Sequence, residues 1–414
     1  MRGPGILLVE ASARGKLFTT IPLGPQYSQT LAINNVGVID MATGQVQESQ
    51  NILINGNSIV SMQSEAINPG AENNFDATGM FVMPGLADMH VHLYFSNNPA
   101  SFATTDNSVL PALLANGVTT VQDLGSNCDA VKNTVQRIGQ SELLGPRIFT
   151  TCEMLDGEDS RFETVKRLQD PEAVESEVQN LMAQGVNKIK VHLRPSRPVF
   201  QAIAAACQKN NIMFGGHVPD SIDAREAVDQ GMNFIEHMSR IPPDDANLTQ
   251  TIGEKQLWVT GTLIQGPSQS RLGLANNLRI AGARMLAGTD TPQGRGLCPN
   301  GATHTELKLM VKAGFTPLQA LQTATTNAYE SLNMLSQLGA IEPGKMADMV
   351  LLRGNPVENI DNIDAIAGVV VNGTLHDNEA LDKMLSDADV VNKLPFACGD
   401  KNATMPRAAA CCSV

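Results

Sequence analysis

The stretch that decides the fold runs from Met83 to Leu93 and reads Met-Pro-Gly-Leu-Ala-Asp-Met-His-Val-His-Leu. It predicts a short strand that carries His90 and His92. Alternate residues of a strand share a face, so the two imidazoles would point the same way while their apolar neighbours pack behind them. Two neutral imidazoles on one rigid face can supply half of a site for zinc or a similar divalent metal. Because a lone His-x-His pair is more often structural, the hypothesis depends on ligands elsewhere in the chain.

Beyond this stretch, short apolar or β-branched runs alternate with segments of helix length. Seven such runs follow the first, at residues 117–123, 147–151, 188–193, 213–218, 234–238, 258–263 and 285–290. Eight strands separated by helices over roughly 250 residues predict an α/β fold of the (β/α)8 TIM barrel type, whose catalytic face lies at the C-terminal ends of the strands. A doubly wound open sheet is the structural alternative.

The 414-residue chain is longer than one barrel, and strand-like runs flank the alternating region on both sides. Asn55-Gly56 before it and Asn372-Gly373 after it are typical of hairpin turns. We therefore expect residues 30–80 and 336–392 to form one discontinuous, β-sandwich-like outer domain, interrupted by the barrel at residues 81–335. The tails, residues 1–29 and 393–414, show little periodicity and are expected to be poorly ordered.

Charge and composition narrow the range of partners. A formal net charge of −13 makes nucleic acid or an anionic membrane surface an unfavourable partner. The sequence contains no apolar run of 18 residues, so we expect no transmembrane helix. The seven cysteines are odd in number and contain no Cys-x-x-Cys pair. Reduced thiols and a cytoplasmic location are the simpler expectation, with a secreted form left open. A small-molecule substrate is the expected partner, and a homo-oligomer is left open.

Three further side chains match the histidine pair in placement. His217 and His237 lie near the ends of predicted strands, and Asp290 ends the last one. A carboxylate at the end of a buried strand requires a cation. Each of these residues alone would more often be structural, but five of them at one rim of a barrel favour a metal site.

Lys190 is the most diagnostic residue of this set. The apolar residues beside it, Ile189 and Val191, share one face of the predicted strand, so Lys190 and His192 point into the barrel. Burial lowers a lysine pKa and makes the neutral amine accessible. Such an amine can add carbon dioxide and become a carbamate, which is able to bridge two metal ions. A salt bridge to an acidic neighbour is the alternative.

These motifs resemble the amidohydrolase superfamily, and within it the imidazolonepropionase-like branch that includes metal-dependent dipeptidases of the Xaa-Pro type. The resemblance extends from Leu31 to about Asp377. It rests on the motifs Pro84-Gly85-Leu86-Ala87-Asp88-Met89-His90-Val91-His92, Gly117-Val118-Thr119-Thr120-Val121-Gln122-Asp123, Ile189-Lys190-Val191, Gly216-His217-Val218-Pro219, Ile235-Glu236-His237, Gly288-Thr289-Asp290 and Gly339-Ala340-Ile341-Glu342-Pro343-Gly344. One segment departs from the pattern, because Val191-His192-Leu193-Arg194 stands where characterised dipeptidase relatives tend to have a Gly-Gly loop.

The resemblance implies a binuclear centre with two divalent ions, zinc by preference. His90, His92 and Asp290 would hold one ion, His217 and His237 the other, and carboxylated Lys190 would bridge them. The implied reaction is hydrolysis of a carbon–nitrogen bond by a metal-bound hydroxide, with Asp290 moving the proton to the leaving nitrogen. The metal itself or His192 would stabilise the oxyanion, although His192 fits a structural role about as well.

Substrate predictions rest on three arginines. Arg194, Arg197 and Arg295 could clamp a substrate carboxylate, which would favour a dipeptide or an N-acyl amino acid, although any one of them is more often a solvated surface residue. Without such a clamp, a cyclic amide or a heterocycle opened at a carbon–nitrogen bond is favoured, and a deaminase is a further enzymatic alternative. A non-catalytic interaction protein on the same barrel is a remote alternative, because such a protein would be expected to lack a ligand and none is missing.

Overall fold

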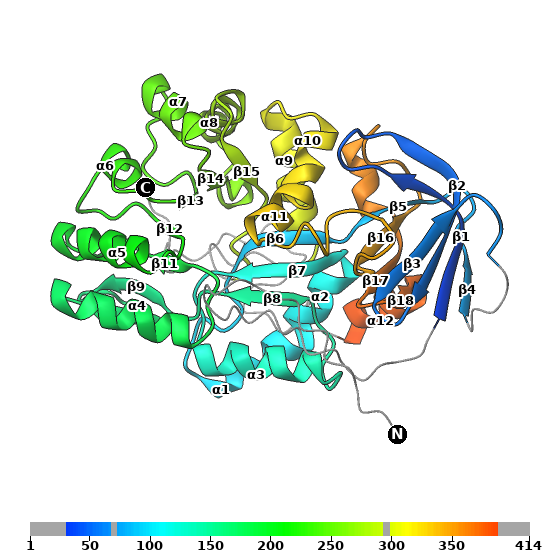
Figure 1. Ribbon diagram of the computed structural model, residues 1–414, viewed down its shortest axis with the longest axis horizontal. Helices are drawn as coiled ribbons and strands as arrows, with labels where there is room; N and C mark the ends of the chain where they lie inside the picture. The colour runs from blue at the N-terminus through cyan, green and yellow to red at the C-terminus, as the bar shows by residue number, and fades with distance from the viewer. Residues whose placement is uncertain (1–29, 68–72, 293–298, 388–414) are drawn as a thin grey trace.

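The computed structural model describes residues 30–67, 73–292 and 299–387. The predicted tails and Arg295 therefore lie outside the described residues. The described chain is an α/β structure with one mixed sheet and two parallel sheets (Figure 1).

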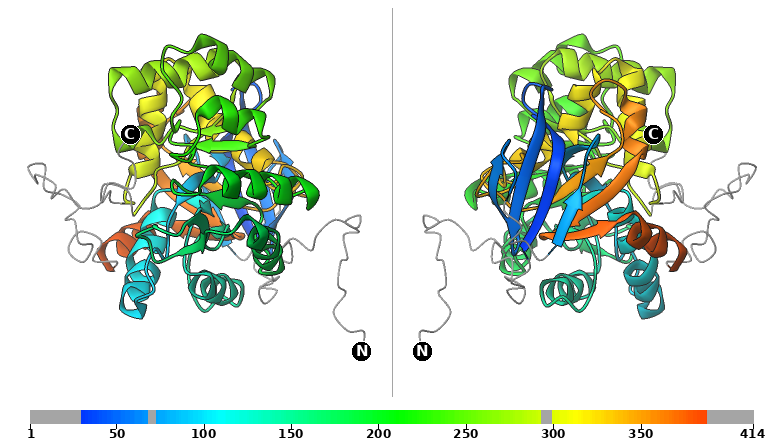
Figure 2. Two further views of the ribbon diagram at one scale, coloured as in Figure 1. Left: turned by 90° about the vertical axis from the view of Figure 1, so that its left-hand side faces the viewer. Right: turned by 90° about the vertical axis from the view of Figure 1, so that its right-hand side faces the viewer.

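The mixed sheet, which we call the outer sheet, combines strands from both parts of the chain. Its order is β18-β17-β16-β5-β1-β2-β3, with β4 also paired to β1. Its strands are β1 (Thr30–Ile39), β2 (Val46–Asn55), β3 (Ser58–Gln63), β4 (Asn73–Asp76), β5 (Phe81–Pro84), β16 (Met349–Leu352), β17 (Ile366–Val371) and β18 (Thr374–Asp377). The right-hand view of Figure 2 shows the early strands beside the late ones. Residues far apart in the sequence thus share one continuous sheet.

Turn chemistry fixes the two hairpins of the outer sheet as the sequence predicts. Asn372 and Gly373 have φ values of 49° and 80° and join β17 to β18, whose pairing is antiparallel. Two successive positive φ values are what a tight hairpin turn needs, and Asn-Gly adopts them readily. The turn after Asn55 joins β2 to β3 in the same antiparallel way.

The stretch from Met83 to Leu93 serves two sheets rather than one. Its first part is β5 of the outer sheet, and its second part is β6 (Leu86–Val91) of a parallel sheet. Gly85 lies at the change of sheet, where a β-carbon would stand 2.1 Å from Oγ1 of Thr119. Only glycine allows this close approach between neighbouring strands.

The eight predicted strands of the alternating region are all present, in two parallel sheets. One has the order β6-β7-β8 and the other β10-β9-β11-β12-β13-β14-β15. The strands after β6 are β7 (Val118–Asp123), β8 (Arg147–Thr150), β9 (Met154–Gly157), β10 (Val165–Leu168), β11 (Ile189–Val191), β12 (Phe214–Gly216), β13 (Phe234–Glu236), β14 (Trp258–Thr260) and β15 (Arg284–Leu286). Backbone contacts link the sheets, since Asp290 donates to His90 O at 2.7 Å and Asn187 donates to Thr150 O at 3.4 Å.

Strands β9 and β10 were not predicted. They form a short parallel pair between β8 and β11, and β9 pairs with β11. Each has only four residues, and a run of that length carries too little alternation to be distinguished from a loop.

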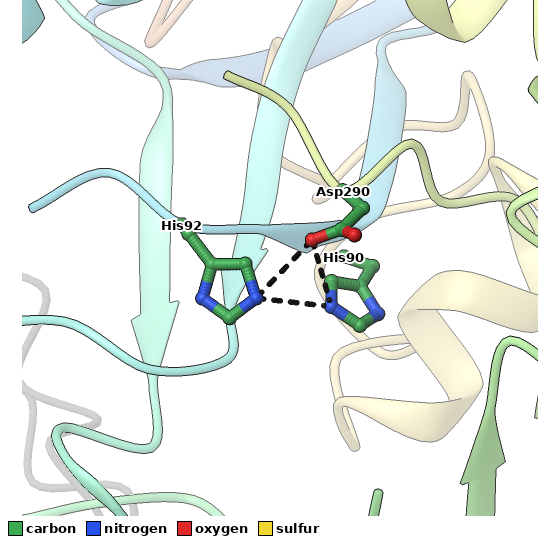
Figure 3. Close-up of side chains that lie close together, drawn as sticks. All are labelled: His90, His92 and Asp290. Atoms are coloured by element: carbon green, nitrogen blue, oxygen red, sulfur yellow. Dashed lines mark hydrogen bonds and ion pairs between the residues drawn. The ribbon is translucent and has the colours of Figure 1, made fainter. Parts of the chain in front are cut away.

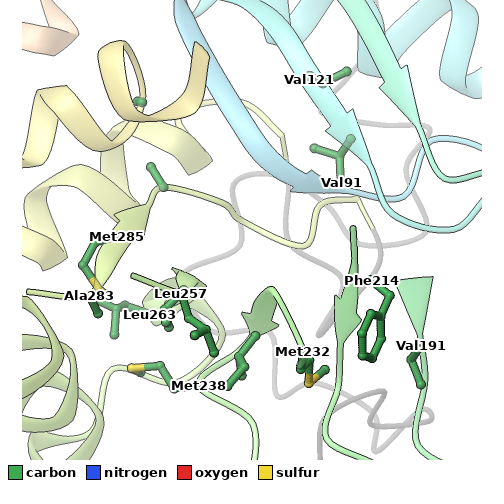
Figure 4. Close-up of a cluster of buried hydrophobic side chains, with 14 of the residues drawn as sticks. Val91, Val121, Val191, Phe214, Met232, Met238, Leu257, Leu263, Ala283 and Met285 are labelled. Carbon is green, nitrogen blue, oxygen red and sulfur yellow. The ribbon is translucent and has the colours of Figure 1, made fainter. Parts of the chain in front are cut away.

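Helices follow most of the parallel strands and pack outside them (Figure 1). They are α1 (Pro99–Thr104), α2 (Leu110–Ala115), α3 (Cys128–Gly139), α4 (Val174–Ala183), α5 (Arg197–Lys209), α6 (Ala224–Asp229), α7 (Ala246–Glu254), α8 (Gln269–Ile280), α9 (Ala302–Ala313), α10 (Pro317–Thr323), α11 (Thr326–Ser331) and α12 (Asn378–Asp387). Four single-turn segments accompany them: η1 (Thr105–Val109), η2 (Pro171–Ala173), η3 (Leu263–Gln265) and η4 (Ile360–Asp364). The main apolar core lies between strands and helices, and Figure 4 shows part of it, including Val91, Val191 and Phe214.

The expectation of reduced thiols is wrong for two cysteines. Cys128 at the start of α3 and Cys152 after β8 form a disulfide. They lie 24 residues apart in sequence, and the adjacency of β7 and β8 brings their Cα atoms to 4.6 Å. Sequence spacing alone could not reveal this pair, because it arises from the packing of neighbouring strands.

None of the helices in residues 30–67, 73–292 and 299–387 has the length and apolar character needed to cross a membrane.

Candidate metal centre

His90, His92 and Asp290 meet at the C-terminal ends of β6 and β15 (Figure 3). Nε2 of His90 lies 3.2 Å from Nε2 of His92, and Oδ1 of Asp290 lies 3.5 Å and 3.2 Å from these two atoms. All three side chains are buried. Two nitrogens and one oxygen therefore face one point, and the two histidines point the same way, as the sequence predicts.

The other ring nitrogen, Nδ1, of His90 and of His92 contacts a group on the side away from Asp290. Nδ1 of His90 lies 2.6 Å from Oε2 of Glu236, and Nδ1 of His92 donates to Gly125 O at 2.9 Å. Burial, followed by the nearby Lys190 charge, lowers the pKa of His90 well below its usual range. A neutral imidazole that donates through Nδ1 presents a free electron pair at Nε2, which is the form that binds a metal.

Asp290 is held by its backbone rather than by donors to its carboxylate. Its φ is 64°, and its amide donates to His90 O at 2.7 Å. The preceding Thr289 donates its amide and its hydroxyl to the buried Asp88 carboxylate, at 3.0 and 2.7 Å. Both carboxylate oxygens of Asp290 are buried and accept no hydrogen bond from the described residues. A buried carboxylate in this state calls for a cation.

His217 and His237 lie next to the first group of ligands. The ring of His237 is 4.5 Å from that of His90 and 4.6 Å from that of His217, between centroids. Nδ1 of His237 lies 2.8 Å from Oγ1 of Thr262. Burial lowers the pKa of both His217 and His237 well below the usual range, so both rings are neutral near pH 7. The two predicted histidine pairs therefore share one buried region.

Lys190 lies inside the same region and is fully buried. Its charge also lowers the pKa of His90, His217 and His237, after the larger effect of burial. Gly216 has φ +126°, and a β-carbon there would lie 2.6 Å from Cδ of Lys190. The glycine before His217 thus makes room for the lysine side chain.

His192 lies beside His217. Its ring is 4.6 Å from that of His217, and its Nδ1 lies 2.9 Å from Oδ2 of Asp156. Asp156 also accepts the amide of Arg194 at 2.7 Å. Burial lowers the pKa of His192, although Asp156 acts in the opposite direction. His192 is therefore a neutral ring oriented by a carboxylate.

The predicted substrate arginines are less well placed than the metal ligands. The Arg194 side chain is 43% exposed, and its guanidinium lies 3.6 Å from Asp220. Arg240 contacts the other oxygen of Asp220 at 3.3 Å. A substrate carboxylate at Arg194 would compete with this surface ion pair. Arg295 falls outside the described residues.

The sequence gives no prediction for the residues that contact the histidines of the site, namely Glu236, Asp156 and Thr262. Strand alternation would turn Glu236 away from the site if His237 faced it. Instead His237 has φ +61°, so the backbone leaves the strand conformation and both side chains reach the centre. A charged residue inside the apolar run Phe234–Met238 was the available signal. Asp156 lies in β9, whose four residues are too few to predict a strand.

The donor set fits a divalent metal ion. The three ligand atoms of His90, His92 and Asp290 all lie within 4.8 Å of one another. Imidazole nitrogens with a carboxylate oxygen suit zinc and neighbouring transition metals. The Asp290 oxygens without a donor and the two oriented Nε2 atoms are the features that an ion would complete.

The match of residues 81–376 to a family of amidohydrolases, together with this buried site, makes the chain a hydrolase that acts on carbon–nitrogen bonds. The chain belongs to the amidohydrolase family, which residues 81–376 match. This family is metal-dependent, in agreement with the donor set.

Three proteins illustrate what this chain is similar to. Ochratoxinase of Aspergillus niger is 24% identical over 355 residues, which span 67% of this chain and 71% of the relative. Adenine deaminase of Listeria monocytogenes is 25% identical over 370 residues, spanning 84% of this chain and 58% of the relative. The crystal structure of a Xaa-Pro dipeptidase with bound methionine in the active site has a TM-score of 0.71 and 21% identity, covering 84% of this chain and 100% of that one. This last likeness shows the shared fold.

Proposed function

We propose that this amidohydrolase cleaves the amide or peptide bond of a dipeptide or an N-acyl amino acid, with two zinc ions as cofactors. His90, His92 and Asp290 would hold one ion, His217 and His237 the other, and a carboxylated Lys190 would bridge them. The convergence of the His90, His92 and Asp290 ligand atoms within 4.8 Å carries the proposal. The burial of Lys190 among histidines supports the bridge.

The placement of the ligands agrees with a single interrupted (β/α)8 barrel. The two parallel sheets would be its parts, with the backbone contacts at His90–Asp290 and at Thr150–Asn187 closing the ring. In such a barrel the strand ends that carry the ligands form one catalytic face.

Bound at these residues, the metal would lower the pKa of a water molecule and polarise the carbonyl that is attacked. Asp290 would hold the proton released in the attack and deliver it to the leaving nitrogen, a role supported by carboxylate oxygens that are buried and accept no hydrogen bond from the described residues. Glu236 keeps the His90 ring in one orientation, and Gly125 does the same for His92. The chain's own contribution is thus orientation and proton transfer.

His192 fits a different role from the oxyanion stabiliser expected from the sequence. The Asp156 carboxylate accepts a hydrogen bond from Nδ1–H of His192. The neutral ring therefore presents Nε2 as a hydrogen-bond acceptor. An acceptor would repel an oxyanion but could bind an N–H group of the substrate. We therefore propose that His192 orients the substrate through its nitrogen.

The test is hydrolysis of a panel of dipeptides and N-acyl amino acids by protein stripped with a chelator and then reloaded with zinc. We expect activity only in the reloaded protein.

Replacing Arg194 with alanine should raise KM for substrates that carry a carboxylate, and an unchanged KM would exclude the clamp. Metal content of Lys190→Ala, measured with and without bicarbonate, should fall below that of the wild type in both cases. Full metal content in this variant would refute the carbamate bridge.

A deaminase is the second candidate, favoured by the likeness to adenine deaminase. Ammonia release from adenine, without cleavage of any amide in the panel, would replace the first proposal with this one. If the enzyme were instead a cyclic amidase, hydrolysis of a cyclic amide would give one ring-opened product and no second fragment.

A further inference from the structure

Two phenylalanines contact histidines of the site. Phe95 follows β6, and its ring centroid is 4.8 Å from that of His92. Phe162 lies between β9 and β10, and its ring centroid is 4.9 Å from that of His192. The two phenylalanine rings are 5.3 Å apart, and both side chains are half-buried. The row of rings therefore joins His92, a proposed metal ligand, to His192, a proposed substrate contact.

The backbone next to each ring is held in place. Glu163 accepts hydrogen bonds from the Asn97 amide at 2.8 Å and from the Ser96 hydroxyl at 3.2 Å. Arg167 donates to Phe162 O at 2.8 Å. Glu163 thus links the segment after Phe95 to the segment that carries Phe162. The relative position of the two rings is set before any ligand arrives, which lowers the entropy cost of binding.

A comparison with Phe102 shows what distinguishes this pair. Phe102 is also half-buried, but it packs against Tyr94 and the main apolar core. Phe95 and Phe162 contact each other and the imidazoles of the site. Partly exposed aromatic faces beside convergent polar groups are typical of a small-molecule pocket.

We propose that Phe95 and Phe162 form an aromatic subsite that binds an aryl group of the substrate next to the scissile amide. An aryl ring can meet the two phenylalanines in edge-to-face or offset arrangements, which are the favoured geometries of aromatic pairs. The substrate class becomes an amide between an amino acid and an aromatic acid, or an N-acyl aromatic amino acid. This inference rests on the proposed function and adds the specificity to it.

The experiment compares N-benzoylalanine and N-acetylphenylalanine with N-acetylalanine on the zinc-loaded full chain. We expect the better aromatic substrate to exceed N-acetylalanine in kcat/KM by about tenfold or more. Phe95→Leu and Phe162→Leu should each lower the ratio of kcat/KM for the aromatic substrate to kcat/KM for N-acetylalanine several-fold. Phe102→Leu, the matched control, should leave this ratio unchanged. The aromatic substrate and N-acetylalanine are measured on one preparation, so the ratio does not depend on the fraction of folded protein.

A ratio that both subsite variants leave unchanged, or a wild type without aromatic preference, would overturn the subsite. Calorimetric binding of the same three compounds to the stripped protein tests it separately from catalysis. Tighter binding of an aromatic compound that is lost in Phe162→Leu supports the subsite even if no amide is hydrolysed, an outcome that refutes the proposed function alone. Equal binding of all three compounds would count against the subsite.

Discussion

The core of the outer sheet is built from aliphatic side chains: Ile33 on β1 and Ile52 and Ile54 on β2 are all fully buried. At the ends of the parallel strands, the buried side chains are instead His90, Lys190, Glu236 and Asp290. Burying an aliphatic group stabilises the fold, whereas burying an ionisable group costs free energy unless it is paired. The strand ends thus retain an energetic cost that serves binding, and the outer sheet is one region that offsets it.

The largest expected effect comes from removing the buried charge at the strand ends. Asp290→Asn should lower kcat by about 10²–10⁴-fold, because the proton acceptor is lost. Its melting temperature without metal should not fall, because the variant removes a buried carboxylate that has no donor among the described residues. Steady-state rates and thermal melting measure the two effects. Wild-type activity in this variant would contradict the role given to Asp290.

A substitution in the core of the outer sheet should have the opposite effect, because it should lower stability and leave activity unchanged. Ile33→Ala should lower the free energy of unfolding by about 2–5 kcal/mol, because it removes a fully buried side chain. Activity per folded molecule should stay the same. Val60→Ala is the matched control, since Val60 lies on β3 of the same sheet and is 50% exposed. Urea denaturation of both variants gives the comparison, and equal effects would contradict the assignment of this core.

A smaller effect is expected from the group that orients a ligand. Glu236→Gln should weaken metal affinity by about 10–100-fold, because the charged acceptor behind His90 becomes neutral. Competition with a chromogenic chelator measures this affinity. The stability of the metal-free variant separates orientation from folding. If affinity were unchanged, the contact between Glu236 and His90 would have no part in binding.

The smallest effect concerns the ion pairs that join the two regions. Asp364 on η4 contacts His304 and Lys308 on α9, and the hydrogen bond from His304 lowers the pKa of Asp364 to about 2. A lowered carboxyl pKa stabilises the folded state above about pH 4, and this stability is lost as the pH falls toward 2. Asp364 is 55% exposed, so solvent screening keeps the effect below about 1 kcal/mol.

Unfolding of Asp364→Asn compared with the wild type between pH 2 and 6 would measure it. The two curves should approach each other at the acidic end. A difference that grows as the pH falls would have the wrong sign for this pair.

The sequence predicts the strands and ligands that follow simple periodicity. The sequence predicts that Lys190 and the His90–His92 pair point into the site because His-x-His and the run around Lys190 alternate with apolar residues. Glu236 and His237 break that period, since His237 adopts a left-handed backbone conformation. The disulfide between Cys128 and Cys152 and the contact of Asp156 with His192 depend on which strands are neighbours, and the short β9 gave no signal of its own.

Strand β5 has a consequence for any attempt to isolate the catalytic part of the chain. It is hydrogen-bonded to β1 on one side and to β16 on the other, and it continues through Gly85 into β6. A fragment of residues 81–335 alone would lack both β1 and β16, so β5 would have two open edges. Such edges template aggregation. The fragment would therefore be prone to self-association at the very segment that leads to His90.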